Sequence, residues 1–447
     1  MLFFLPFNQK PAMRAGFPVV GGGWPLLGHF FRMSRDFLGF IQKAEAQHGK
    51  LFWVNGGFGR DSLVCTAPEA FNVFRSKALN SESFSLLAND FLGQSLVVQD
   101  GSKHTRMRGA MNSPFTPKGL GGTELGPMMA EVIEQTVAQF HEGQTLRILH
   151  TTRELTLSVL FRMIGAPVEE LEEWRHHYEE FMMLIVPPNI NLPGFPHYRG
   201  LKAKKWLDHK LSTLIQRVRE NPEPGKLLTQ LVQGKDEKGE GLTEQELLDN
   251  LRLLVLAGHE TTASTMAWMA VVLGREPEIW QKLVAEATAA AEVPRVPKAL
   301  RGFPYAEGVF REALRLHPPA IQDGRRVQAE FKLCDQLIPV GTDITVPIVF
   351  LSRHPEQYPE PNRFNPERWV EKQGAIEALE LIQFGGGAHF CLGYHVAWME
   401  SVQFAVALAR QLSAKGLRLL HEGPYPRFEY LPLLHMPSKT QVRIVKA

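Results

Sequence analysis

The chain has 447 residues, of which 44% are hydrophobic and 21% charged, a balance typical of a folded globular protein with a large core. Its 49 lysines and arginines nearly match its 47 aspartates and glutamates, and the formal net charge of +2 argues against nucleic acid as the main partner. The three cysteines, Cys65, Cys334 and Cys391, form no CxxC pair, so the sequence offers no disulfide framework and fits a reducing compartment. We expect Cys65 and Cys334 to be small buried hydrophobes.

The chain begins with seven apolar residues, MLFFLPF. This stretch is far shorter than the roughly twenty residues that a transmembrane helix needs. It also lacks the basic region and the cleavage site of a signal peptide. We therefore expect a cytoplasmic protein without a transmembrane anchor, and a weak surface contact of this segment with a membrane stays open.

The first part of the chain alternates loops with short elements. The glycine- and proline-rich residues 16–28 predict irregular backbone, and they contain neither of the common phosphate-binding glycine motifs. A helix is predicted at 37–48, and a hairpin with strands at 51–54 and 63–66.

Helical spacing of apolar residues then dominates up to about residue 300. The predicted helices are 68–77, 101–112, 125–140, 146–164, 171–183, 198–220 and 225–233. Two long apolar loops, 81–98 and 185–196, interrupt this pattern. Loops of that length without structure are uncommon unless they cover a binding site.

The longest predicted helix covers 242–274 and starts with a capping box from Thr243 to Glu246. It is apolar on all sides, so it must cross the interior of the fold. The remaining predicted elements are helices at 277–291, 306–316 and 394–412, strands at 326–333, 344–348 and 441–445, and an irregular proline-rich stretch at 354–369. We predict one mainly helical domain over 1–447 with a minor β portion, at about 50–66, 326–348 and the C-terminal strands.

Residues 384–393, FGGGAHFCLG, place Cys391 in a glycine-rich loop directly before a predicted helix. The start of a helix carries roughly half a positive charge and favours a thiolate. From these residues alone, Cys391 is a candidate nucleophile or metal ligand. No accompanying histidine and asparagine pattern supports the nucleophile.

Four motifs together resemble the cytochrome P450 family. The stretch FGGGAHFCLG resembles its haem-binding loop, AGHETT (257–262) its central-helix motif, EALR (312–315) its ExxR pair and FNPERW (364–369) its meander motif. They occur in the order found in the family, and the resemblance covers nearly the whole chain, weakest before about Lys50. It implies a cytochrome P450 fold, haem b (iron protoporphyrin IX) as cofactor and O2 as co-substrate.

The resemblance also implies roles for single residues. Cys391 would be the axial thiolate ligand of the haem iron, a ligation that favours O–O bond cleavage. The haem propionates would bind four basic residues: His104, Arg108, Arg325 (with Arg326 as its alternative) and His389. The macrocycle would lie against further residues of the loop and the central helix: Phe384, Gly385, Gly393 and Ala257.

Thr261 and Glu260 stand in the middle of the apolar helix, where polar groups are costly to bury without partners. The Thr261 hydroxyl is expected to bond the carbonyl four residues back and to open the helix beside Gly258. The resemblance implies that both residues deliver protons during dioxygen activation; a purely structural helix kink is the alternative. Glu312, Arg315 and Arg368 would form the family's structural ion network.

The substrate pocket would lie on the haem face opposite Cys391, and its mostly apolar walls predict a hydrophobic substrate. The candidates are Phe84, Leu86, Leu87, Phe91, Leu92, Leu184, Ile185, Leu254, Ala257, Ala320, Ile321, Leu433 and Leu434, with Gln322 and Asp323 as polar contacts.

We therefore expect a monomeric haem–thiolate monooxygenase that hydroxylates or epoxidises a hydrophobic small molecule. No flavin or nicotinamide domain is recognised in the chain, so electrons would come from a ferredoxin or flavodoxin with its reductase, docked near Lys103, Arg106 and Arg108 by charge complementarity. Two alternatives remain: an enzyme that uses peroxide or rearranges hydroperoxides, and a non-catalytic haem sensor.

Overall fold

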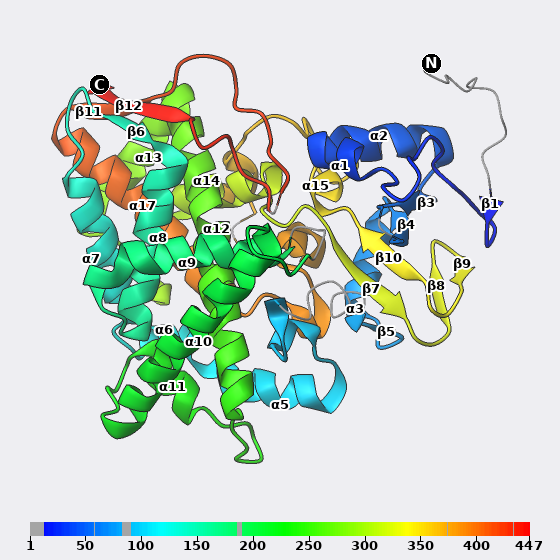
Figure 1. The fold of residues 1–447 in the computed structure, drawn as a ribbon. Coiled ribbons are helices and arrows are strands. Elements are labelled where there is room, and N and C mark those ends of the chain that lie inside the picture. Colours follow the sequence, from blue (N-terminus) through cyan, green and yellow to red (C-terminus); the bar gives the residue numbers. More distant parts are fainter. Residues whose placement is uncertain (1–12, 58, 83–90, 186–189, 373, 432) are drawn as a thin grey trace.

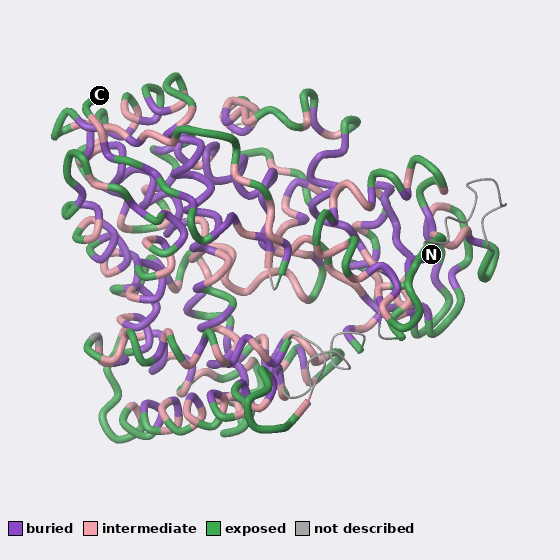
Figure 2. Tube along the Cα trace, turned by 45° about the horizontal axis from the view of Figure 1, so that its top comes forward, coloured by how far each residue is buried: buried purple, intermediate pink, exposed green. Residues whose placement is uncertain are grey.

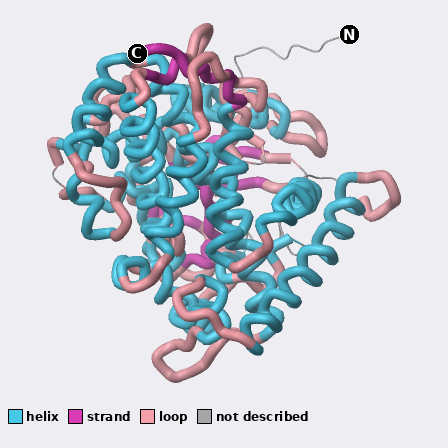
Figure 3. The backbone as a smooth tube through the Cα atoms, turned by 90° about the vertical axis from the view of Figure 1, so that its left-hand side faces the viewer, coloured by secondary structure: helices cyan, strands magenta, loops and turns pink. Residues whose placement is uncertain are grey.

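The structure is a computed structural model, and it describes residues 13–57, 59–82, 91–185, 190–372, 374–431 and 433–447. A helix-rich part and a β-rich part lie side by side, and Figure 1 shows the long helix α12 (Glu244–Arg275) within the helix-rich part. Helices account for most of the chain and strands for a small share (Figure 3). The mainly helical fold with a minor β portion is thereby confirmed.

The β-rich part is built on a five-stranded sheet with the order β3-β4-β10-β7-β5. Neighbouring strands are antiparallel except for β4 and β10, which run parallel. The strands are β3 (Leu51–Asn55), β4 (Asp61–Cys65), β10 (Asp343–Val346), β7 (Asp323–Val327) and β5 (Leu79–Asn80).

Short elements surround this sheet. They are β1 (Met13–Arg14), β2 (Phe17–Pro18), α1 (Phe30–Arg35), α2 (Phe37–His48), α3 (Asn72–Arg75), the separate hairpin β8 (Phe331–Leu333) and β9 (Gln336–Ile338), and α15 (Ile348–Leu351).

The helix-rich part packs around α12, whose most extensive helix partner is α8. Its other members are α5 (Gly101–Asn112), α6 (Pro117–Gly121), α7 (Leu125–Ala138), α8 (Ile148–Ile164), α9 (Leu171–Met182), α10 (Pro196–Glu220), α11 (Leu227–Gln233), α13 (Pro277–Ala289), α14 (Pro304–Leu316), α16 (Glu367–Val370) and α17 (Tyr394–Ala414). A small sheet, β11-β12-β6, joins Leu417–Leu420, Gln441–Lys446 and Thr145–Arg147.

One contiguous cluster of buried apolar side chains runs through both parts. In Figure 2 the buried positions follow the interior, while exposed positions follow the outer turns. Helix α12 is buried over most of its length, as its apolar sequence predicts. The predicted capping box from Thr243 to Glu246 is also present.

Several predicted boundaries were wrong. Residues 146–164 do not form one helix, because Thr145–Arg147 is strand β6, which pairs with β12 and buries Leu146 between two exposed neighbours. The predicted strand 326–333 is split, since β7 stays in the five-stranded sheet and β8 turns away into its own hairpin. Strand β10 stops at Val346, because Pro347 lacks the N–H that would continue the ladder.

The predicted helix 68–77 is a 3-10 turn (Pro68–Phe71) followed by α3, which ends at Arg75. The first predicted strand pair, the helix 101–112 and the C-terminal strand agree closely with β3, β4, α5 and β12.

Candidate functional site

The loop that carries Cys391 is bent by glycines and ends at the first turn of α17. Gly385 and Gly387 have φ values of +71° and +61°, which side-chain-bearing residues rarely adopt. A Cβ atom on Gly387 would lie 2.0 Å from the Phe74 carbonyl oxygen. The amide of Cys391 donates to the Phe384 carbonyl at 2.9 Å, and Gly393 is the N-cap of α17. The sequence therefore holds the sulfur at a fixed point beside a helix start.

The electrostatic surroundings of the sulfur are mixed. Burial raises the pKa of the Cys391 thiol, whereas the N–H groups of Gly393 and Tyr394 and the Arg108 guanidinium lower it. The helix start alone predicts a lowered pKa for this thiol, and burial opposes that effect. Metal coordination removes the thiol proton outright, so the N–H groups would then stabilise a thiolate.

Aromatic rings enclose the loop on one side. The ring of Tyr394 meets Phe384 edge-on, with centroids 4.8 Å apart, and Phe390 at 5.4 Å. The Tyr394 hydroxyl accepts a hydrogen bond from Arg311 on α14. These contacts fix the first turn of α17 relative to the loop.

The four predicted basic residues come together from three separate parts of the chain. The rings of His104 on α5 and His389 have centroids 4.3 Å apart, and Arg108 donates to the Phe390 carbonyl at 2.6 Å. Arg325 on β7 is buried and pairs with Asp323 at 2.8 Å. Asp323, which the sequence placed as a polar contact of the substrate pocket, is thus an ion-pair partner of Arg325.

Arg326, the alternative to Arg325, lies on the other face of β7. It forms a two-point ion pair with Asp343 at 2.9 and 2.7 Å, away from the histidines. Side chains alternate across a strand, so only one of the two neighbouring arginines can enter the cluster. Arg325 therefore lies with the other predicted basic residues, and Arg326 pairs elsewhere.

The protonation of His104 gives a fit test for an anionic group. Burial, with the positive charges of His389, Arg108 and Arg325, lowers the pKa of His104 to about 4. Its Nε2 atom is buried and has no hydrogen-bond partner. An unpaired ring nitrogen among cationic groups fits a carboxylate ligand, and the haem propionates are carboxylates. The residues present therefore fit the haem that the loop motif implies.

Asp100 completes this cluster, and sequence reasoning missed it. Its carboxylate lies 3.1 Å from His389 Nε2 and accepts from the Ser81 amide at 2.8 Å. No motif marks Asp100, because it stands directly before α5 in a loop without a pattern.

The prediction for the polar residues in the middle of α12 is confirmed for the hydrogen bond of Thr261 but not for the opening of the helix. The Thr261 hydroxyl donates to the Ala257 carbonyl four residues back, and Ala257 and Gly258 are exposed in the middle of a mostly buried helix. The helix was predicted to open beside Gly258, and this is wrong, since α12 is continuous from Glu244 to Arg275. A threonine can make this bond without breaking the helix.

Glu260 is not free. Its Oε2 atom accepts two hydrogen bonds from Arg153 on α8, at 3.1 and 2.9 Å. Its Oε1 atom lies 3.6 Å from Nε2 of His259, and His259 Nδ1 lies 2.9 Å from the Thr156 hydroxyl. Sequence reasoning missed Arg153 because it lies 107 positions from Glu260.

The predicted ion network is present, with Glu312 and Arg315 fully buried and Arg368 mostly buried. Arg315 binds Glu312 at 2.8 Å by two nitrogens, and Arg368 donates to the same carboxylate at 3.0 Å. Arg315 also donates to the carbonyls of Ser352 and Pro361. The network therefore joins α14 to the irregular segment before α16.

The pocket candidates separate by exposure. Phe91, Leu92, Leu184 and Leu434 are buried, Leu254, Ala320, Ile321 and Leu433 are half-buried, and Ile185 is exposed. Phe84, Leu86 and Leu87 lie outside the described residues. Leu434 connects the C-terminal segment to two other parts of the chain. Its amide donates to the Pro319 carbonyl, and its carbonyl accepts from the Ser264 hydroxyl on α12, both at 2.9 Å.

The proposed basic docking surface is only partly available. Arg106 is bound to Glu246 and to the Gly241 carbonyl, and Arg108 is turned to Phe390. Lys103 binds the Gln94 side chain at 3.0 Å. Arg106 and Arg108 thus have internal partners, which the sequence could not show.

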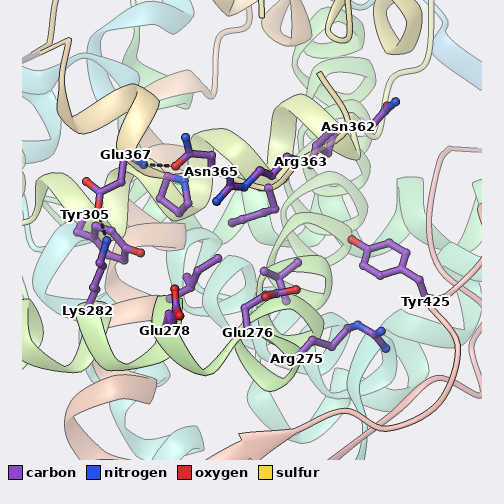
Figure 4. A pocket seen from close by; sticks show the side chains of 15 residues that line it. Arg275, Glu276, Glu278, Lys282, Tyr305, Asn362, Arg363, Asn365, Glu367 and Tyr425 are labelled. Atoms are coloured by element: carbon purple, nitrogen blue, oxygen red, sulfur yellow. Dashed lines mark hydrogen bonds and ion pairs between the residues drawn. The ribbon is translucent and has the colours of Figure 1, made fainter. Parts of the chain in front are cut away.

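A separate polar pocket of about 360 Å³ lies between the end of α12, the start of α13 and residues 362–367 (Figure 4). Lys282 and Glu367 form an ion pair across it at 2.6 Å. Its lining contains none of the predicted site residues, so it is distinct from the Cys391 site.

Within the described residues, no group of three or more histidine, cysteine, aspartate or glutamate side chains could hold a metal ion. A haem iron that the protein binds through a single cysteine sulfur does not require such a group. Among the same residues, no helix is long and apolar enough to cross a membrane.

Comparisons with known proteins agree with this geometry. A family model described as cytochrome P450 matches residues 18–440. The chain is 36% identical to a cytochrome P450 BJ-4 homolog of Sinorhizobium fredii, over 97% of both chains. It is 32% identical to a cyclooctat-9-en-7-ol 5-monooxygenase of Streptomyces melanosporofaciens, over 87% of both chains.

Among solved structures, retinoic acid-bound cyanobacterial CYP120A1 matches with a TM-score of 0.85 at 22% identity, covering 98% of this chain and 100% of that one. At this identity the match supports the fold.

Proposed function

Because this chain belongs to the cytochrome P450 family, we propose that its site residues act as a haem–thiolate centre with Cys391 as the axial ligand of the iron. The family makes the chain an oxidoreductase of the monooxygenase class. The observation that carries the assignment is the glycine-held Cys391 at the start of α17, with its sulfur facing two helix N–H groups.

Haem, when bound, supplies the activation of dioxygen and the oxidation of the substrate. The chain would hold its two propionates with His104, Arg108, Arg325 and His389. Phe384, Gly385, Gly393 and Ala257 would contact the macrocycle. The unpaired His104 Nε2 supports this arrangement.

Thr261 and Glu260 would move protons to the dioxygen side of the site. Glu260 forms an ion pair with Arg153 on α8, which would orient its carboxylate for this role. The Thr261 hydroxyl, bound to the Ala257 carbonyl, would orient the last proton donor.

The substrate is a hydrophobic small molecule. Leu254, Ala320, Ile321 and Leu433 are half-buried apolar residues near the central helix and the last turn, and they support an apolar wall. The Streptomyces relative acts, by its name, on cyclooctat-9-en-7-ol, and another, 28% identical over 88% of this chain, is named pentalenene oxygenase. We propose apolar carbocycles and their alcohols as the first substrate class to test.

Electrons would come from a separate ferredoxin or flavodoxin with its reductase. We further propose that residues 1–447 act as one domain, as a monomer in the cytoplasm.

Turnover under labelled dioxygen tests the reaction type. With a ferredoxin, its reductase and an apolar carbocycle, the product should gain one labelled oxygen from ¹⁸O₂. The alternative with peroxide as oxidant predicts that turnover needs no electron donor and that the label comes from peroxide. That result would overturn the monooxygenase assignment of the site.

A further inference from the structure

The two cysteines outside the candidate haem site lie against one another. Their sulfur atoms are 3.9 Å apart, although 269 positions separate them in sequence. Cys65 is the last residue of β4 and is fully buried, whereas Cys334 is partly exposed. The sequence treated them as two unrelated apolar residues; the structure makes them a pair, and the proposed monooxygenase chemistry uses neither.

We propose that Cys65 and Cys334 are a redox-active dithiol, which a peroxide converts into a disulfide that links β4 to the β8–β9 hairpin. The site is independent of the haem chemistry. Its oxidant is hydrogen peroxide.

The chemistry balances in two steps. The Cys334 thiolate attacks the O–O bond of the peroxide, forms a sulfenic acid and releases water after proton transfer. The Cys65 sulfur then attacks the sulfenic sulfur, forms the S–S bond and releases a second water. Two thiols and one peroxide become one disulfide and two waters, and the two electrons pass from the sulfurs to the peroxide.

The surroundings favour Cys334 as the first thiol to react. It is partly exposed, so peroxide can reach it, whereas Cys65 is covered. The contact with Cys65 lowers the pKa of Cys334, and the same contact, with burial, raises the pKa of Cys65. Lys50 favours the Cys334 thiolate, while Glu69 and Asp335 oppose it.

The hairpin leaves room for the bond to form. Cys334 and Asp335 make its two-residue turn, with φ values of +49° and +59°. Among the described strands, β8 and β9 pair only with each other, so ladder bonds to the five-stranded sheet do not fix this turn. A disulfide needs the sulfurs to approach to ~2.0 Å. The hairpin connects β7, which carries Arg325, to β10, so the bond would restrain the sheet that supports the propionate cluster.

Peptide mapping of the full-length protein tests the proposal. The protein is treated with hydrogen peroxide or with reductant, unfolded, alkylated with iodoacetamide and digested. Peroxide should remove two of the three alkylatable thiols and give one linked species containing Cys65 and Cys334, lighter by two hydrogens than the separate peptides. Reductant should reverse the change. A Cys334 oxidised beyond sulfenic acid with Cys65 still alkylatable, a link to Cys391, or a link between two chains would each overturn it.

Thermal melting tests the mechanical consequence. The linked wild type should melt at a higher temperature than the reduced protein, because the disulfide restrains the unfolded chain. Cys334→Ser should form no link and show no rise with peroxide. An equal rise in Cys334→Ser would show that the bond does not restrain the fold. The mapping on wild type stands even if a variant folds poorly.

Discussion

At the scale of single residues, the site rests on side chains whose partners are distant in sequence. Thr261 is the most local of them, since its hydroxyl binds a carbonyl in its own helix. We predict that Thr261→Ala raises the share of electrons lost as hydrogen peroxide several-fold, because the hydroxyl that orients the last proton donor is removed. Peroxide and product are measured against NADH consumed. Thr261→Ser keeps the hydroxyl and should stay near wild type; equal coupling in wild type and Thr261→Ala would remove this residue from the proton path.

Arg153 decides where Glu260 points in this structure. We predict that Arg153→Leu lowers the turnover rate on the order of tenfold, since the carboxylate loses both guanidinium hydrogen bonds that orient it. Steady-state rate and its solvent isotope effect are the measurements. Arg153→Lys keeps the charge with fewer bonds and should fall between the two. An Arg153→Leu enzyme with unchanged rate and isotope effect would show that this ion pair has no part in proton delivery.

Burial of His259 should make the stability of the protein depend on pH. Burial lowers its pKa to about 4, below the 6.5 of a free histidine. The unfolded chain therefore binds more protons between these values, so stability rises with pH across that window and falls as pH drops from 6.5 toward 4, by up to about 3 kcal/mol.

The check is chemical unfolding at several pH values between 4 and 7. His259→Gln should flatten the curve, whereas His209→Gln on the exposed face of α10 should leave its slope unchanged. The same slope in His259→Gln and wild type would contradict this assignment.

At the scale of elements, the buried network on α14 is what holds the irregular segment in place. We predict that Glu312→Gln lowers the free energy of unfolding by roughly 3–5 kcal/mol, because Arg315 and Arg368 would keep their charges in the interior without a carboxylate. Urea unfolding of the full chain measures it. The exposed pair of Glu360 and Arg363 is the control, and Glu360→Gln should cost less than about 1 kcal/mol. Equal costs would mean that burial of the network is unimportant.

Element boundaries show what a single sequence could not provide. The helices α5 and α12 were predicted nearly to the residue, because the signals that mark them, such as the capping box of α12, are local. Strand β6 was missed because its three residues form a strand only beside β12, almost 300 positions later. The break between β7 and β8 likewise depends on which sheet each segment joins.

The candidate site divides in the same way. Cys391, Thr261 and the Glu312 network stand in motifs with fixed spacing and were therefore found. Arg153, Asp100 and the contact between Cys65 and Cys334 were not, since each depends on two helices, loops or strands meeting in space. The choice of Arg325 over Arg326 required the face of β7, which only the sheet register defines.

At the scale of the whole molecule, the helix-rich and β-rich parts each supply residues to the cluster of His104, Arg108, Arg325 and His389. His104 and Arg108 come from α5, Arg325 from β7 and His389 from the loop before α17. The fold therefore has to be assembled before the basic residues meet. Haem binding should accordingly stabilise the assembled chain, since a ligand that binds only the folded state shifts the equilibrium toward it.

A single spectrum can identify the axial ligand of the iron. The haem-loaded protein is reduced, exposed to carbon monoxide and compared with Cys391→Ser treated in the same way. Wild type should show the strongly red-shifted Soret band of thiolate ligation, and Cys391→Ser should lose it. A variant that retained that band, or a wild type that lacked it while holding haem, would contradict Cys391 as the axial ligand.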